Sequence, residues 1–158
     1  MILGLHHVAM ATINLDAMLR FYRDLMEFEV VAEGSWNKGS PRHDALVGLK
    51  DSAARFVVLR RGHTYIELFC YSSPQPARND PNRPVSDAGI THLCLAVDGI
   101  EHEYTRLLDA GVRFHTAPGP KGPMQTTYGR DPDGNVFELI EFSDANHPFR
   151  FLCETEAA

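Results

Sequence analysis

Two histidines and two glutamates occur in this chain as two copies of one pattern. His7 lies in the segment LHHVAMAT and Glu67 in TYIELF, while His92 lies in THLCLAVD and Glu138 in NVFELIEF. Each histidine opens a short strand-like run, and each glutamate lies inside another. Imidazole nitrogens and carboxylate oxygens bind first-row divalent metals, and four such ligands leave room for a substrate on an octahedral ion. The pattern therefore predicts a metal site built from two copies of a half-site.

Each of these residues also has a simpler interpretation. A single histidine on a strand is more often a hydrogen-bonded or surface residue than a ligand, and a glutamate can lie on a strand edge. Repetition favours metal binding, because a carboxylate inside an apolar run is costly to bury without a partner. Strand alternation places His6 on the face opposite His7, so we interpret it as a bystander. The remaining histidines have no counterpart in the repeat and are predicted to be solvated: His43, His63, His102, His115 and His147.

The elements that must position the four residues also repeat. Residues 7–30 and 92–114 each predict a strand, a helix and a strand. The first helix has its apolar stripe at Leu15, Met18, Tyr22 and Leu25 and a plausible N-cap at Asn14. The second has its stripe at Ile100, Tyr104, Leu107 and Leu108, a capping box at Asp98 and Glu101, and Gly111 just beyond its end. The two segments are therefore interpreted as an internal repeat.

Further strands follow each repeat. HDALVGL, ARFVVLRR and TYIELFCY in the first half, and MQTTYGR and VFELIEF in the second, are rich in strand-forming residues, and DPDGN is a turn signal. The predicted fold class is α+β, with two tandem βαβββ modules forming a curved mixed sheet that closes around the metal site. The modules span residues 1–72 and 90–142, joined by a Pro- and Asn-rich linker at 73–89 and followed by a C-terminal tail at 143–158, all within one domain.

Strand alternation predicts which side chains share a face with the ligands. Tyr65, Phe69 and Tyr71 fall on the face of Glu67 and are predicted to bind a small, partly apolar substrate, although aromatic residues in strands are more often plain core. Arg130, just before DPDGN, is predicted to steer an anionic substrate, its simpler interpretation being a surface charge beside a turn.

Composition narrows the class of partner. The net charge of −6 argues against nucleic acid and anionic membranes, and there is no apolar run of about 20 residues. No signal peptide is visible, and the three cysteines (Cys70, Cys94 and Cys153) show no CxxC spacing. We therefore expect a cytoplasmic protein with reduced thiols and a small molecule as partner.

The segments LHHVAMAT, FYRDLMEF, YIELF, GITHLCLAVD and RDPDGNVFELIEF, from His7 to Phe142, together resemble the vicinal oxygen chelate superfamily of glyoxalases, bleomycin resistance proteins and dioxygenases. The resemblance implies paired βαβββ modules around a metal held by His7, Glu67, His92 and Glu138, and a homodimer. The four-ligand set is more similar to glyoxalase I than to the dioxygenases, which use two His and one Glu.

The segment after Glu67, ELFCYSSPQP, lacks the Asn with which glyoxalase I helps to hold glutathione, so the use of glutathione stays open. ELF followed by a Pro-rich linker and GITH is closer to methylmalonyl-CoA epimerase-like members. The additional carboxylate base that such an epimerase uses has a candidate in Asp44, by position alone.

The leading functional hypothesis is a lyase or isomerase. One divalent ion (Ni, Zn, Co, Mn or Fe) would stabilise an enolate or enediolate of a small carbonyl substrate, with Glu138 as the catalytic group that moves the proton. One alternative is an Fe(II)-dependent extradiol-type ring-cleaving dioxygenase, in which Glu67 would lie off the metal. The other alternative is a non-catalytic binding or resistance protein, which typically lacks the ligand set.

Overall fold

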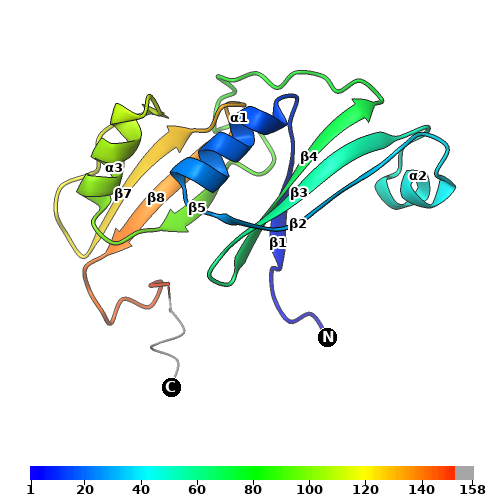
Figure 1. Ribbon diagram of the computed structural model, residues 1–158. Coiled ribbons are helices and arrows are strands. Elements are labelled where there is room, and N and C mark those ends of the chain that lie inside the picture. The colour runs from blue at the N-terminus through cyan, green and yellow to red at the C-terminus, as the bar shows by residue number, and fades with distance from the viewer. Residues whose placement is uncertain (152–158) are drawn as a thin grey trace. The chain divides into compact units, whose positions relative to one another are not determined.

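The computed structural model describes residues 1–151 and divides the chain into two compact units, Met1–Asp80 and Pro81–Ala158. The division falls inside the predicted linker at 73–89. Each unit contains one four-stranded mixed sheet (Figure 1). The last part of the predicted tail, with Cys153, lies outside the described residues.

Unit 1 begins with a strand, a helix and a strand, as predicted. Its elements are β1 (His7–Ala11), α1 (Leu15–Leu19) with a π-helical continuation η1 (Arg20–Leu25), β2 (Glu29–Trp36), α2 (Pro41–Val47), β3 (Ala53–Arg61) and β4 (Thr64–Ser73). The sheet order is β1-β4-β3-β2, with β1 parallel to β4 and the other pairs antiparallel.

Unit 2 repeats this arrangement without the equivalent of α2. Its elements are β5 (His92–Ala96), α3 (Ile100–Asp109), β6 (Arg113–Phe114), β7 (Met124–Arg130) and β8 (Val136–Phe142). The sheet order is β5-β8-β7-β6, again with one parallel pair, β5 and β8. Both units therefore follow the βαβββ order, and the predicted α+β class is confirmed, with one sheet in each unit.

The core of unit 1 lies on the sheet face opposite Glu67. Ile66 and Leu68, which flank Glu67 on β4, are 2% and 0% exposed, and Met18 and Tyr22 of the helix are fully buried. The helix starts where predicted, because the Asn14 side chain accepts a hydrogen bond from Ala17 N. Alternation along β4 thus separates a buried apolar face from the face that carries Glu67, the predicted metal ligand.

The core of unit 2 follows the same rule. Ile100 and Leu107 of α3 are fully buried. Phe137 and Leu139, the two neighbours of Glu138 on β8, are 0% and 1% exposed. Leu108, predicted to lie on the buried stripe, is 46% exposed instead. The buried stripe of α3 is therefore narrower than predicted.

The predicted capping box of the second helix is wrong. The N-cap is Gly99, whose φ of 78° suits glycine, and the helix-start amides of Gly99 and Ile100 donate to the Glu141 carboxylate, at 2.7 and 3.1 Å. Glu141 lies on the side of β8 opposite Glu138. One face of β8 therefore caps the start of α3 through Glu141, and the other face carries Glu138 beside His92. Gly111, with φ of 86°, follows the helix end as predicted.

The segment HDALVGL is a helix, not the predicted strand. α2 has Pro41 at its first turn and ends at Gly48, which adopts a left-handed φ of 67°. Proline is preorganised for a helix start and glycine for the residue after its end. These helix-start and helix-end signals outweigh the strand preference of the apolar residues between them.

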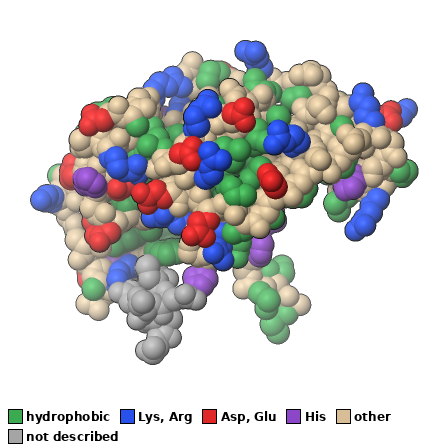
Figure 2. Space-filling view, viewed as in Figure 1, with side chains coloured by type: hydrophobic (Ala, Val, Ile, Leu, Met, Phe, Trp, Pro, Cys, Tyr) green, Lys and Arg blue, Asp and Glu red, His purple; other side chains and the backbone are tan. Residues whose placement is uncertain are grey.

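The longest helix, α3, has ten residues, and among residues 1–151 none of the helices has the length and apolar character needed to cross a membrane. On the face that Figure 2 shows, acidic and basic side chains are interspersed between smaller apolar areas.

Candidate metal centre

The first predicted ligand pair comes together in unit 1. β1 and β4 are parallel with Ala9 opposite Glu67, and this register brings His7 Nε2 to 3.3 Å from Glu67 Oε2. The His7 side chain is 42% exposed and that of Glu67 is 19% exposed. Ala9 and Ala11, the small residues beside His7 on the same face, are exposed. The pair therefore lies at an accessible position on the sheet.

The second pair repeats this geometry in unit 2. Cys94 is opposite Glu138 in the parallel register of β5 and β8, and His92 Nε2 lies 3.1 Å from Glu138 Oε2. The other carboxylate oxygen of Glu138 accepts a 2.5 Å hydrogen bond from Thr126 Oγ1 on β7. With its side chain only 11% exposed, Glu138 is the more buried of the two carboxylates.

The atoms of each pair fit two neighbouring positions on a divalent ion. Ligands about 2.1 Å from one metal and at right angles to each other are about 3.0 Å apart. The observed N···O distances of 3.3 and 3.1 Å are close to this value. Among residues 1–151, no group of three or more His, Cys, Asp or Glu side chains is arranged to hold a metal. Each unit thus presents a pair, and the four-ligand site stays a proposal.

Two weak acids surround Glu138. Burial, and then the Glu138 carboxylate, raise the pKa of the Cys94 thiol to about 12, and the same two causes raise the pKa of Tyr128. Both groups are therefore neutral near pH 7, so Cys94 is not a thiolate nucleophile. Tyr128 also contacts the His92 ring edge-on, with the centroids 5.1 Å apart.

Each ligand histidine has a hydrogen-bonding partner in the residue before it. His6 Nδ1 lies 2.9 Å from His7 Nδ1, and Thr91 Oγ1 lies 2.8 Å from His92 Nδ1. The His6 ring is stacked on Tyr65, with centroids 4.9 Å apart and an interplanar angle of 4°. The interpretation of His6 as a bystander is therefore wrong: β1 begins at His7, so strand alternation does not govern His6.

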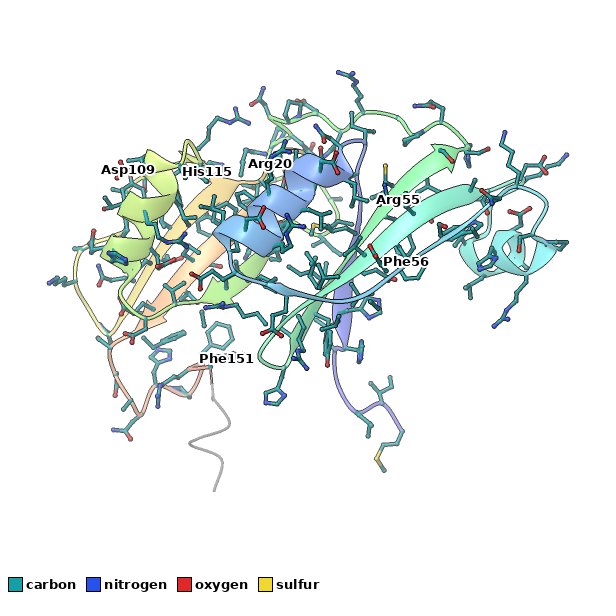
Figure 3. The ribbon with its side chains drawn as sticks, in the orientation of Figure 1. Arg20, Arg55, Phe56, Asp109, His115 and Phe151 are labelled. Atoms are coloured by element: carbon teal, nitrogen blue, oxygen red, sulfur yellow. The ribbon has the colours of Figure 1, made fainter. Side chains whose placement is uncertain are left out.

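The face that carries Glu67 continues into an aromatic cluster. Phe69 and Tyr71 stack at 5.9 Å, and Trp36 of β2 contacts both edge-on, at 6.1 and 5.9 Å. Phe56 of β3 lies 5.9 Å from Phe69, and Figure 3 shows it on the side of the strand opposite its neighbour Arg55. Phe69 and Tyr71 were predicted from alternation. Trp36 and Phe56 were missed, although alternation along their own strands would have found them.

α2 completes this aromatic cluster. His43, predicted to be solvated, is half-buried and stacks on Trp36 at 5.0 Å. Trp36 Nε1 donates to Ser52 Oγ, which donates to Asp44 of α2. Asp44 also accepts from the amides of Ser52 and Asp51. These bonds, led by the Ser52 hydroxyl, lower the pKa of Asp44, which makes it a weaker base and fits a structural role better than catalysis.

Two other predicted substrate residues have protein partners. Tyr65 faces His6, as described above. Arg130 donates to two backbone carbonyls, Gly134 O at 2.8 Å and Arg83 O at 2.9 Å, and so ties the β7–β8 turn to the segment that precedes β5. Partial desolvation, and then the positive charge of Arg130, lower the pKa of His115, which is an exposed residue whose ring stacks on Tyr128. Substrate binding by Tyr65 and Arg130 stays a prediction.

The match to known proteins agrees with the fold. Residues 4–139 match the Glyoxalase/Bleomycin resistance protein/Dioxygenase superfamily, and the chain therefore belongs to this superfamily. The resemblance drawn from the repeated motifs is confirmed.

Particular relatives add detail. The chain is 31% identical to a 2-epi-5-epi-valiolone epimerase of Actinomyces sp, over 92% of this chain and 82% of the relative. A glyoxalase family protein of Bacillus cereus has a TM-score of 0.80 at 18% identity, covering 90% of this chain and 95% of that one. A variant of a Listeria monocytogenes fosfomycin resistance protein, solved with Mn(II) and 1S,2S-dihydroxypropylphosphonic acid, has a TM-score of 0.60 at 15% identity, covering 88% and 92%. The two structural similarities show a shared fold.

Proposed function

We propose that this protein is a metal-dependent isomerase or lyase that removes a proton from the carbon beside a carbonyl group of a small molecule. The observation that carries the proposal is the duplicated His–Glu pair, with nearly equal Nε2···Oε2 distances in the two units. In this proposal His7, Glu67, His92 and Glu138 bind one divalent ion together. Such an ion would act as a Lewis acid for the charge that develops on the substrate oxygen.

Glu138 is the proposed base. Its carboxylate accepts from Thr126 on one oxygen and faces His92 with the other, so both oxygens are oriented. Tyr128 and Cys94, protonated near pH 7, do not compete with it for the substrate proton. Return of the proton to the same carbon gives an isomerase, and loss of a neighbouring group gives a lyase.

The isomerase is the better supported of the two outcomes. Epimerisation beside a carbonyl group needs only removal and return of one proton, and a 31% identical relative is an epimerase by name. The aromatic cluster beside Glu67 supports a substrate with an apolar or ring-shaped face, since such faces stack on aromatic side chains.

Metal content tests the shared site. Purified protein is titrated with Zn²⁺, Co²⁺, Ni²⁺ and Mn²⁺, and we expect one ion per chain. Replacement of either histidine by glutamine should weaken binding, with His102→Gln, a histidine outside the pairs, as the control. Two ions per chain would mean that each pair binds alone, and no binding would contradict the proposal.

Proton exchange tests the reaction. The metal-loaded protein is incubated in D₂O with 2-epi-5-epi-valiolone and with simple α-hydroxyketones, and the signal of the proton beside the carbonyl is followed by NMR. We expect deuterium incorporation that depends on metal and on Glu138. Oxygen consumption with catechols and bound iron would instead support the dioxygenase.

The oligomeric state and location belong to the same proposal. We propose a cytoplasmic homodimer on the strength of the family resemblance and the free thiols of Cys70 and Cys94. Sedimentation of the metal-loaded protein would check the dimer.

A further inference from the structure

The residue before each ligand histidine makes the same contact in both units. His6 and Thr91 differ in chemistry, yet each places a polar atom within 2.9 Å of the Nδ1 atom of the histidine that follows. In both units the opposite ring nitrogen, Nε2, faces the glutamate. Each ligand ring is therefore held at both nitrogens, with Nε2 turned to the proposed metal position.

We propose that His6 and Thr91 are positioning residues that hold His7 and His92 through Nδ1 and thereby determine that Nε2 binds the metal. The inference rests on the proposed metal function. A neutral imidazole has one donor and one acceptor nitrogen, so a partner that accepts from Nδ1 leaves the lone pair of Nε2 available. Partners of this kind fix the ring orientation of metal-binding histidines.

The partners share a second property, because an imidazole and a hydroxyl can each donate or accept. In a metal-free tautomer with its proton on Nε2, the histidine would donate to the glutamate and accept at Nδ1 from His6 or Thr91. A metal held by Nε2 would require the proton on Nδ1, which would then donate to the same partner. Thr91 makes this reversal by rotating its hydroxyl, whereas His6 must change its own tautomer. No net charge changes in either ring.

The surroundings of His6 explain how an exposed ring keeps this position. Its parallel stacking on Tyr65 fixes the plane of the ring, and its edge-on contact with His7 has centroids 5.2 Å apart at 90°. Tyr65 is opposite His7 in the register of β1 and β4. Tyr65, predicted to bind substrate, thus also holds the ring of His6 in contact with His7.

Matched variants test the proposal with metal alone. Thr91→Val removes the hydroxyl at constant shape, and Thr91→Ser restores it. We expect Thr91→Val to weaken Zn²⁺ or Co²⁺ binding by roughly 10- to 100-fold, with Thr91→Ser within about threefold of the unaltered protein. His6→Phe keeps the stacking on Tyr65 but lacks the nitrogen, and His6→Asn, which retains a polar group, should bind metal more tightly than His6→Phe.

The ring nitrogens give a readout that needs no metal or substrate. ¹⁵N–¹H correlation spectra of the metal-free protein report the tautomers of its eight histidines. We expect His92 to be protonated on Nε2 without metal, and Thr91→Val, but not Thr91→Ser, to shift its Nδ1 resonance. Cobalt absorption bands should also change in Thr91→Val.

The outcomes separate the two proposals. Suppose that the unaltered protein binds metal, and that Thr91→Val matches Thr91→Ser both in metal affinity and in the Nδ1 resonance of His92. This inference is then overturned, and the metal site stands. If the unaltered protein binds no metal, the proposed function fails. The ¹⁵N spectra then still decide whether His6 and Thr91 hold the two rings.

Discussion

The two units place the same ligand pair on corresponding strands but surround it differently. Opposite Glu67 are Ala9 on β1 and Val58 on β3, whereas opposite Glu138 are Cys94 on β5 and Tyr128 on β7. The residues directly opposite Glu67 are apolar and lead into the aromatic cluster, where the Tyr71 phenol also has its pKa raised by burial and by Glu67, whereas the residues directly opposite Glu138 both carry a proton. Under the proposed function, this difference predicts that the two halves of the site have different roles: unit 1 would contact the carbon skeleton of the substrate, and unit 2 would transfer the proton.

The largest test of this division is to alter the two carboxylates in turn. Glu138→Gln should lower kcat by roughly 10²- to 10⁴-fold, because an amide can still coordinate a metal but does not accept the proton. Glu67→Gln should mainly weaken metal binding and leave kcat closer to that of the unaltered protein at saturating metal. Turnover and metal content are measured together. Equal losses of kcat in both variants would contradict the division.

Each unit has a glycine packed against a phenylalanine ring, and the two rings differ in how deeply they are buried. A Cβ on Gly129 would lie 2.4 Å from the Phe137 ring, and one on Gly34 would lie 2.7 Å from the Phe56 ring. Phe137 is fully buried and Phe56 only half-buried, so Phe56 has room to move. Overpacking typically costs about 1–3 kcal/mol, and we expect Gly129→Ala to cost more than Gly34→Ala in urea unfolding. The reverse order would show that the aromatic cluster is the more rigid region.

Ser52→Ala tests the support of the aromatic cluster. It leaves the buried Nε1 of Trp36 without its partner, which should cost about 1–2 kcal/mol. Trp36 is the single tryptophan of the chain, so its fluorescence reports the change directly. Asp44→Asn, which keeps the Trp36–Ser52 bond, is the matched control and should shift the emission less. Binding of the single metal ion should be unaffected by either variant.

The smallest expected effect is a pH dependence confined to the same region. Hydrogen bonds from Ser52 hold the pKa of Asp44 below its ordinary value of 3.8. A lowered carboxyl pKa contributes stability above the unfolded value, and this contribution is lost as the pH falls through the folded value. Trp36 emission should therefore be constant at neutral pH and change only below about 3.8. A transition at a higher pH would show that a group other than Asp44 controls the emission.

The sequence predicted the parts of the site that depend on local alternation. The two ligand pairs, the buried neighbours of Glu67 and Glu138, and the N-cap Asn14 all follow from residue spacing along one element. α2 could have been recognised by Pro41 and Gly48, which were given too little weight against an apolar run. Strand alternation failed at His6 because the strand begins one residue later.

Other features had no local signal. The cap of α3 comes from Glu141, more than 40 residues along the chain, and Trp36 at the end of β2 donates to Ser52, 16 residues further on and just before β3. Such contacts arise from tertiary packing, which short-range spacing does not encode. The combination of the two pairs into one four-ligand site likewise rests on the repeat and awaits the metal titration.

The position of α2 in the connection between β2 and β3 has an evolutionary consequence. His7 and Glu67 lie on β1 and β4, while Trp36 lies on β2, the edge strand on the other side of β3, and α2 is part of the connection from β2 to β3. Residues 37–52 can therefore be lengthened, shortened or exchanged without displacing a ligand. If the aromatic cluster contacts the substrate as proposed, substrate preference could change during evolution while the four predicted ligands stay in place, and exchanging this segment between relatives would test that.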